Sequence, residues 1–254
     1  MKSRPSKNAW WIVGVLTAMA VLASAKLGFN LSVLKSLGTE MGPSLSKYSR
    51  PAWQDLPRLL KLLAETVAMG VVGSVIALVL GLPAVAFASR NISPNRFLNT
   101  ATRQVLNFFR SMPDALIALL LVQGLGMGPM TGAIALGLHM SGFVGKTLSE
   151  KVERVNPGVI EGLHSCGAGW FQVFRFGALP SIEREIIADS LYIVDRNIRT
   201  AATLGLVGAG GIGVELLSDL RTFHEQEAAT VIVMIIVLVV AVDTASTHLR
   251  KRLA

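Results

Sequence analysis

The sequence has few of the residues that soluble proteins use for cross-links, metal sites and polar surfaces. Its one cysteine, Cys166, excludes an internal disulfide, and its four histidines lack metal-ligand spacing. Charged residues make up only 16% of the chain against 52% hydrophobic residues, a balance too apolar for a soluble domain of 254 residues. The composition therefore predicts a membrane protein and gives no indication of redox or metal chemistry.

Two larger signatures are also absent from the sequence. No G-x-x-x-x-G-K-[ST] phosphate-binding loop occurs in it, so an ATP-driven process would take its power from a separate subunit. The formal net charge of +8 could suggest a nucleic-acid partner, but no basic face interleaved with aromatic residues is present. The lysines and arginines lie beside apolar segments, so membrane topology explains them better and no nucleic acid is expected.

Long apolar runs are what the sequence has instead. A helix needs about 20 mostly apolar residues to cross a hydrocarbon core roughly 30 Å thick. Residues 1–25 hold one such run after a basic start, and this run also resembles a signal peptide with Ala23-Ser24-Ala25 as the cleavage site. Residues 26–65 mix leucines with prolines and charges, which is typical of an extracytoplasmic segment of short surface helices. The core, 66–254, is expected to contain five spans, at about 66–89, 105–125, 130–148, 182–206 and 228–248.

The expected fold is therefore all-α with six transmembrane helices. Gly70, Gly73 and Gly81 are small positions where neighbouring helices can approach the second span, and Pro83 is expected to bend it. Lysines and arginines gather at both termini, in the 90–110 connection and in the 150–181 loop, which places all four on the cytoplasmic side. The six basic residues of 26–65 are an exception, but long loops follow this rule weakly.

The 150–181 loop contains a polar, glycine-containing stretch at 161–180, here called the docking segment. Apolar residues recur in it at steps of three and four, which predicts a short helix with one apolar face. Gly167 leaves that face open to another surface, and Leu179-Pro180 is expected to end the segment because the residue before a proline avoids helical dihedral angles. The residues of the face are Leu163, Cys166, Trp170 and Val173.

The spacing of this segment resembles the EAA loop of ABC importer permeases. Glu161, Gly167, Leu179 and Pro180 match that pattern. The segment departs from it at Gly162 and Leu163, where two alanines are usual, and at Gly177, where an aliphatic residue is common. An ordinary amphipathic linker between two membrane helices is the plainer interpretation.

A second glycine-rich stretch follows the fifth span. Gly208, Gly210 and Gly213 match G-x-G-x-x-G, but dinucleotide binding needs a preceding strand, and a spanning helix precedes these glycines. Two roles remain open for 205–213, here called the glycine connection. Its glycines, including Gly211, either absorb dihedral changes when a transport path opens or only permit close packing.

Residues 197–213, NIRTAATLGLVGAGGIG, closely resemble a segment of phosphonate-type ABC importer permeases, the PhnE family, and the RSMP sequence at 110–113 is similar to that of methionine and phosphonate importer permeases. The resemblance covers about 66–248 and implies a type I, MetI-like permease of the bacterial inner membrane, without catalytic residues or a bound cofactor. It implies a second permease subunit, identical or paralogous, and an extracytoplasmic protein that binds phosphonate, phosphate or phosphite. Two partner ATPases would use ATP and Mg²⁺ and would couple through Glu161, Leu163, Gly167, Trp170, Leu179 and Pro180.

The fifth span carries charges that cannot face lipid, because each costs about 2.5–3.5 kcal/mol at a membrane centre. At about 100° per residue they fall on one side of the helix, here called the polar stripe. Asp195 and Arg199 are four apart and can pair, which leaves Arg196 as a free cation for an oxyanion path. Interhelical ion pairs, or an ion relay in an ATPase-independent carrier or channel, are the alternatives. The stripe comprises Asp189, Tyr192, Asp195, Arg196, Arg199 and Thr203.

Overall fold

The structure, a computed structural model, describes residues 7–26, 36, 39, 42 and 45–253. The chain divides into two units, residues 1–50 and 51–254. In the first unit, α1 (Lys7–Lys26) is a helix whose described side chains are almost all exposed, including Trp10 and Trp11. The expected first span thus coincides with a helix.

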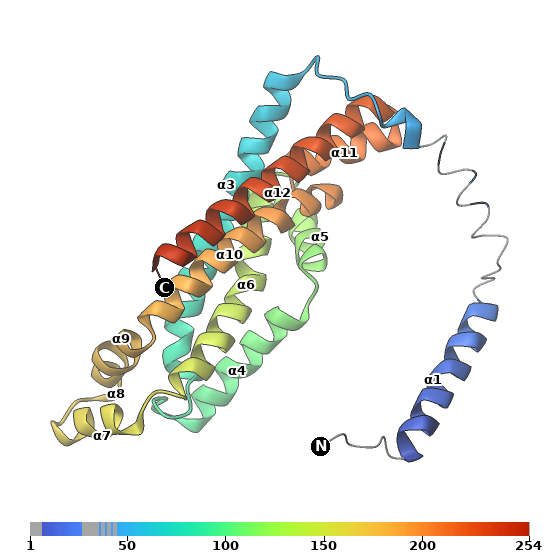
Figure 1. Cartoon of the computed structure of the whole chain (residues 1–254). Coiled ribbons are helices and arrows are strands. Elements are labelled where there is room, and N and C mark those ends of the chain that lie inside the picture. Colours follow the sequence, from blue (N-terminus) through green and yellow to red (C-terminus); the bar gives the residue numbers. More distant parts are fainter. Residues whose placement is uncertain (1–6, 27–35, 37–38, 40–41, 43–44, 254) are drawn as a thin grey trace. The chain divides into compact units, whose positions relative to one another are not determined.

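The second unit is a helical bundle, and no strand occurs among its described residues (Figure 1). Two short non-α turns interrupt it, a π-helical turn at Val173–Ala178 and a 3₁₀ turn at Gly205–Val207. Its helices are α3 (Leu56–Ala88), α4 (Arg96–Ser111), α5 (Asp114–Leu125), α6 (Pro129–Val152), α7 (Pro157–Ser165), α8 (Trp170–Gln172), α9 (Leu179–Ser181), α10 (Glu183–Leu204), α11 (Ile212–Arg221) and α12 (Glu225–Leu253).

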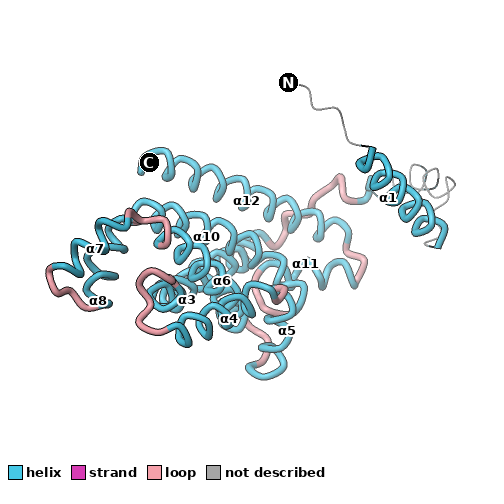
Figure 2. The backbone as a smooth tube through the Cα atoms, turned by 90° about the horizontal axis from the view of Figure 1, so that it is seen from below, coloured by secondary structure: helices cyan, strands magenta, loops and turns pink. Residues whose placement is uncertain are grey.

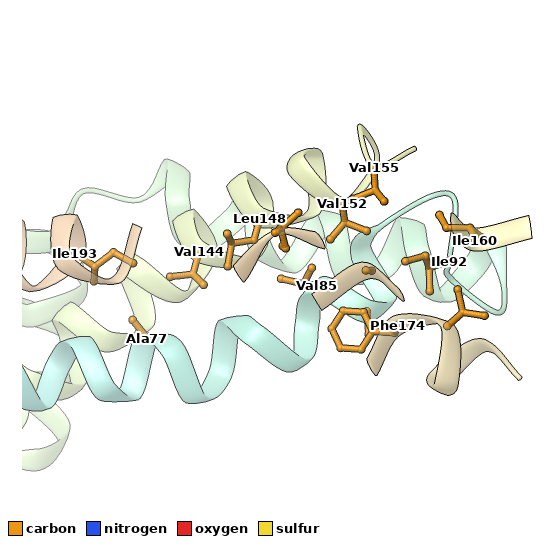
Figure 3. Close-up of a cluster of buried hydrophobic side chains, with 14 of the residues drawn as sticks. Ala77, Val85, Ile92, Val144, Leu148, Val152, Val155, Ile160, Phe174 and Ile193 are labelled. Carbon is orange, nitrogen blue, oxygen red and sulfur yellow. The ribbon is translucent and has the colours of Figure 1, made fainter. Parts of the chain in front are cut away.

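Helix α6 lies at the centre of the bundle, in contact with α3, α4, α5 and α10 (Figure 2). Glycines permit this packing: a Cβ atom at Gly73 would lie 2.8 Å from Leu136 Cβ, and one at Gly81 would lie 2.7 Å from Val144 Cβ. Gly70 meets Ile198 of α10 in the same way, so the small positions of the second span do admit neighbouring helices. Figure 3 shows the apolar cluster that results, running from Ala77 and Ile193 to Ile160 and to Phe174 of the docking segment.

Among the described residues, three stretches are long and apolar enough to cross a membrane, namely Leu56–Ala88, Glu183–Arg221 and Glu225–Arg250, or four if the bent α4–α5 pair counts as one span. Six were expected from the sequence. Helix α6 is not apolar enough to be counted among these stretches. It contacts protein on most sides, and it therefore carries glycines and buried hydroxyls such as Thr131, Ser141 and Ser149 in place of lipid-facing side chains.

The stretch expected to form a span at 105–125 is bent in the structure. Helices α4 and α5 meet at 92°, because Met112, which precedes Pro113, takes an extended conformation (ψ 133°) that ends α4. The 90–110 connection is correspondingly helical from Arg96 onward. Helix α3 also begins at Leu56, ten residues earlier than expected, since Pro57 in its first turn favours helix initiation.

The bundle has two distinct ends. At one end the α3–α4 connection meets the last turn of α6, where Asn91 Nδ2 donates to Val152 O at 3.0 Å. At the other, the glycine connection meets the turn between α5 and α6, and a Cβ at Gly210 would lie 2.7 Å from Pro129 N. Figure 1 shows the C-terminus on the docking-segment side.

Candidate functional site

The docking segment is built from three short helices and one π-helical turn. Helix α7 begins at Pro157 and is capped by Asn156, whose Oδ1 accepts from Gly158 N at 2.9 Å. It ends at Ser165, and Gly167 then takes a left-handed conformation (φ +80°) that turns the chain into α8. The expected single helix through residues 163–173 is therefore wrong, because the glycine that was expected to open its face instead ends it.

The four residues of the expected apolar face point in different directions. Val173 is fully buried and Leu163 packs against the core cluster, whereas Cys166 is exposed. Trp170 rests on the end of α3, with its ring 5.4 Å from that of Phe87, and keeps 36% of its surface exposed.

The apolar surface that the segment does present comes from residues that were not expected. Phe171 and Phe176 are 59% and 67% exposed, and Val159 of α7 is also exposed. Phe171 also lines a mostly apolar cavity of about 560 Å³ between the segment and α3, together with Pro83, Pro180 and Ile186. Exposed apolar side chains on a loop indicate a surface that a partner covers.

Leu163 and Gly177, two departures from the EAA pattern, compensate each other. A Cβ atom at Gly177 would lie 2.7 Å from Leu163 Cδ1. Gly177 is buried and supplies the space that the larger side chain at position 163 occupies. The two departures thus form one packing exchange between α7 and the π-helical turn.

Leu179-Pro180 does not end the segment as expected. Leu179 takes helical angles (φ −60°, ψ −47°), and the chain stays helical to Ser181. Pro180 lies in the first turn of α9, directly after the π-helical turn, where Leu179 N donates to Phe174 O. The helical path breaks instead at Ile182, immediately before α10.

Glu153, which follows the C-terminal end of α6, joins that end to α4 and to the α3–α4 connection. Its Oε1 accepts from Arg90 N at 2.8 Å and ion-pairs with Arg103 Nη2. Arg103 Nε in turn donates to Ala88 O at 2.7 Å. The residue was not singled out in the sequence, because its partners lie 50 and 63 positions away.

In the polar stripe, Arg199 Nη2 ion-pairs with Asp195 Oδ2 as their spacing predicts. Asp195 is 2% exposed while the Arg199 side chain is 41% exposed, so the pair joins the bundle interior to an accessible surface. Arg196 Nη1 contacts Tyr192 OH at 3.5 Å, and no carboxylate partner for it occurs among the described residues. It remains the less compensated cation.

The two ends of the stripe differ. Asp189 Oδ2 ion-pairs with Lys151 Nζ of α6 at 2.7 Å, whereas Thr203 is exposed and donates only to Thr200 O of its own helix. Asn197 was missed: it is buried on another side of α10 and donates through Nδ2 to Ser74 Oγ at 3.0 Å. An asparagine in a span costs free energy unless it is bonded, and that signal could have identified it.

The glycine connection is densely packed. A Cβ at Gly213 would lie 2.1 Å from Ala202 O, and one at Gly211 would lie 2.5 Å from Thr66 Oγ1, the atom that accepts from Ile212 N. Gly208, Gly210 and Gly211 have φ of +87°, +91° and +72°. The G-x-G-x-x-G motif thus follows a helix and forms a packed corner, which agrees with its rejection as a dinucleotide site.

Comparison with known proteins identifies the family. Residues 73–254 match the family described as "Binding-protein-dependent transport system inner membrane component". The chain belongs to this family. Membership confirms the expected non-catalytic inner-membrane transport subunit, and the family's description places such permeases in systems that depend on a binding protein.

Individual relatives agree with this assignment. The permease is 35% identical to the phosphate-import permease protein PhnE of Mycolicibacterium smegmatis over 94% of its own length, but spans only 45% of that relative. It is 34% identical to the phosphite transport system permease protein PtxC of Stutzerimonas stutzeri over 96% of its length and 84% of the relative. A solved structure of the inward-facing MetNI methionine ABC transporter matches 77% of the permease and 96% of the solved chain, with a TM-score of 0.66 and 22% identity. The expected MetI-like fold is confirmed.

Proposed function

We propose that this permease carries phosphate, phosphite or a phosphonate into the cytoplasm as the membrane subunit of an ABC importer. The observation that carries the proposal is its extended similarity to relatives named for phosphate and phosphite transport. An extracytoplasmic binding protein would deliver the oxyanion, and a second permease, identical or paralogous, would complete the path. Both termini and the docking segment then face the cytoplasm, in agreement with the Lys/Arg distribution.

Two ATPases would dock at the end of the bundle that bears the docking segment. The exposed Phe171 and Phe176 and the half-covered Trp170 supply an apolar surface. Gly167 stands beside them with no atom within 4 Å of the place where its Cβ would be, so a partner surface can come close to the backbone there. ATP and Mg²⁺ would be bound by those partners alone.

The polar stripe would line the path. A guanidinium group donates two parallel hydrogen bonds to an oxyanion, and Arg196 is the cation of the stripe without a carboxylate partner among the described residues. Arg199 is held by Asp195 and would supply weaker attraction. The pairing supports a structural role for Arg199 and a transport role for Arg196.

Uptake of radiolabelled phosphate and phosphite by cells that express the complete transporter tests this function. We expect accumulation that depends on co-expressed ATPase, and Arg196→Gln should lower it more than Arg199→Gln in complexes that assemble and hydrolyse ATP. An assembled, ATP-hydrolysing transporter that accumulates neither anion would exclude both as substrates, and failure to accumulate a radiolabelled phosphonate as well would contradict the substrate assignment. Uptake by the permease alone, without ATPase, would instead favour the carrier or channel.

A further inference from the structure

A basic pocket of about 620 Å³ lies at the docking-segment end, between the α3–α4 connection, the polar face of α4 and α6. Its size is within the range of small-ligand sites. Four of the residues that line it are cations, and none of its described lining residues is acidic. The cations are Arg90, Arg96, Arg103 and Lys146.

Two of these cations are already neutralised. Arg103 pairs with Glu153, and Lys146 Nζ lies 3.0 Å from Glu150 Oε1. The side chains of Arg90 and Arg96 are exposed and make no ion pair or hydrogen bond within the described part of the chain. The pocket therefore holds two uncompensated guanidinium groups.

The chemistry of these groups favours a phosphate ligand. Two guanidinium groups match the oxygens and the charge of a tetrahedral phosphate, which they bind through parallel hydrogen bonds. Side-chain amides of Gln104 and Asn107 also line the pocket and can donate to the same ligand.

The other face of α4 places an apolar surface beside the basic pocket. Phe97, Val105 and Phe108 are all more than half exposed, so an apolar surface borders the basic one along the same helix. Basic pockets between membrane helices bind anionic lipid headgroups, and an apolar helix face beside one could receive the acyl chains.

We propose that this pocket binds a phosphate group through Arg90 and Arg96, supplied either by an anionic lipid headgroup or by free phosphate. The site is separate from the polar stripe of α10 and does not depend on what the stripe carries. Neither guanidinium supports the fold in the described structure, so both can be changed without loss of internal bonds.

Two assays on the full-length permease, purified with its co-purifying subunits, distinguish the sources. In the first, inorganic phosphate is titrated calorimetrically into nanodiscs of phosphatidylcholine. In the second, native mass spectrometry measures the phosphatidylglycerol retained from mixed nanodiscs. The test variant is Arg90→Gln/Arg96→Gln, and the matched control is Arg110→Gln, an exposed arginine of α4 that does not line the pocket.

We expect the double variant to bind roughly 30-fold more weakly, because each arginine near an anionic group contributes about fivefold, and the control to match the wild type. Loss confined to the phosphate titration identifies free phosphate, and loss confined to lipid retention identifies the headgroup. The phosphate titration is repeated with the variants in an Arg196→Gln background, so that phosphate bound at the polar stripe does not contribute to the signal. Equal behaviour of the double variant and wild type in both assays, or no binding by the wild type in either, overturns the proposal.

Discussion

Glycine has opposite roles in the two glycine-rich regions of this permease. In the glycine connection, an added Cβ at Gly205 or Gly213 would lie within 2.5 Å of another heavy atom, and the nearest atoms belong to the backbone. In the docking segment, a Cβ at Gly162 or Gly167 would meet nothing within 4 Å. The first set of glycines permits contact inside the chain, whereas the second leaves a surface free.

This difference indicates whether each region acts in the folding of the chain or in its assembly with partners. The glycine connection is closed by backbone contacts between α10 and α11, so its packing partners lie within the same chain. An open backbone beside exposed aromatic side chains is the kind of surface that the proposed ATPase would cover. Changes in the first region should therefore affect folding, and changes in the second should affect assembly and transport.

The largest expected effect is on stability, from Gly213→Ala. The new Cβ would lie 2.1 Å from Ala202 O and cannot be relieved by a side-chain rotation. We expect destabilisation at the upper end of the roughly 1–3 kcal/mol seen for overpacking, or complete loss of folded protein. Thermal unfolding in detergent measures it, with Gly162→Ala as the control in open space. A Gly213→Ala protein as stable as the control would contradict the packed corner.

The second prediction concerns Gly167→Glu, which should abolish ATPase recruitment and uptake while leaving the isolated permease folded. A charged side chain at this open position would project into the partner surface. Because φ is +80° at this position, any L-residue adds about 1–2 kcal/mol of strain. Gly167→Ala is therefore the control for strain. Normal recruitment and uptake by Gly167→Glu would remove this glycine from the docking surface.

Sequence reasoning found both glycine-rich regions but could not assign their roles. Spacing identifies a glycine, whereas the atoms around its missing side chain come from residues distant in sequence, such as Thr66 beside Gly211. The same limit hid the Glu153 contacts and the Leu163–Gly177 exchange. The pairing of Asp195 with Arg199 was predictable because it lies within one helix. The bend before Pro113 could have been predicted from the proline, because the residue before a proline avoids helical dihedral angles. The apolar run that follows Pro113 suggested a continuous span instead.

The third prediction tests whether the docking segment has any closed packing of its own. Gly177→Val alone should destabilise the permease by about 1–2 kcal/mol, because its Cβ would meet Leu163 Cδ1 at 2.7 Å. The double variant Gly177→Val/Leu163→Ala should recover most of that loss, since the smaller side chain vacates the space. A double-mutant cycle of unfolding free energies measures the coupling, and additive effects would show that the two positions do not compensate.

A milder change in the glycine connection is Gly208→Ala. The nearest side-chain atoms, of Met127, lie 3.5 Å from the added Cβ, so only the φ of +87° is unfavourable, at about 1–2 kcal/mol. If the connection moves during transport, we expect lower uptake with intact assembly, because the substitution restricts dihedral angles without a clash. Uptake equal to wild type would leave close packing as the only role of this glycine.

The smallest expected effect is a change in the labelling rate of Cys166, which requires no substitution. The thiol is exposed at the end of α7, one residue before Gly167, so a maleimide should react readily with the isolated permease. If the docking segment lies under an ATPase, the assembled complex should label more slowly, and ATPase removal should restore the rate. Peptide mass spectrometry after timed labelling measures both rates. Since Cys166 is the chain's one cysteine, the signal has a single source within this subunit. Equal rates in the free and assembled permease would place the partner elsewhere and would make the open backbone at Gly167 a solvent-facing turn.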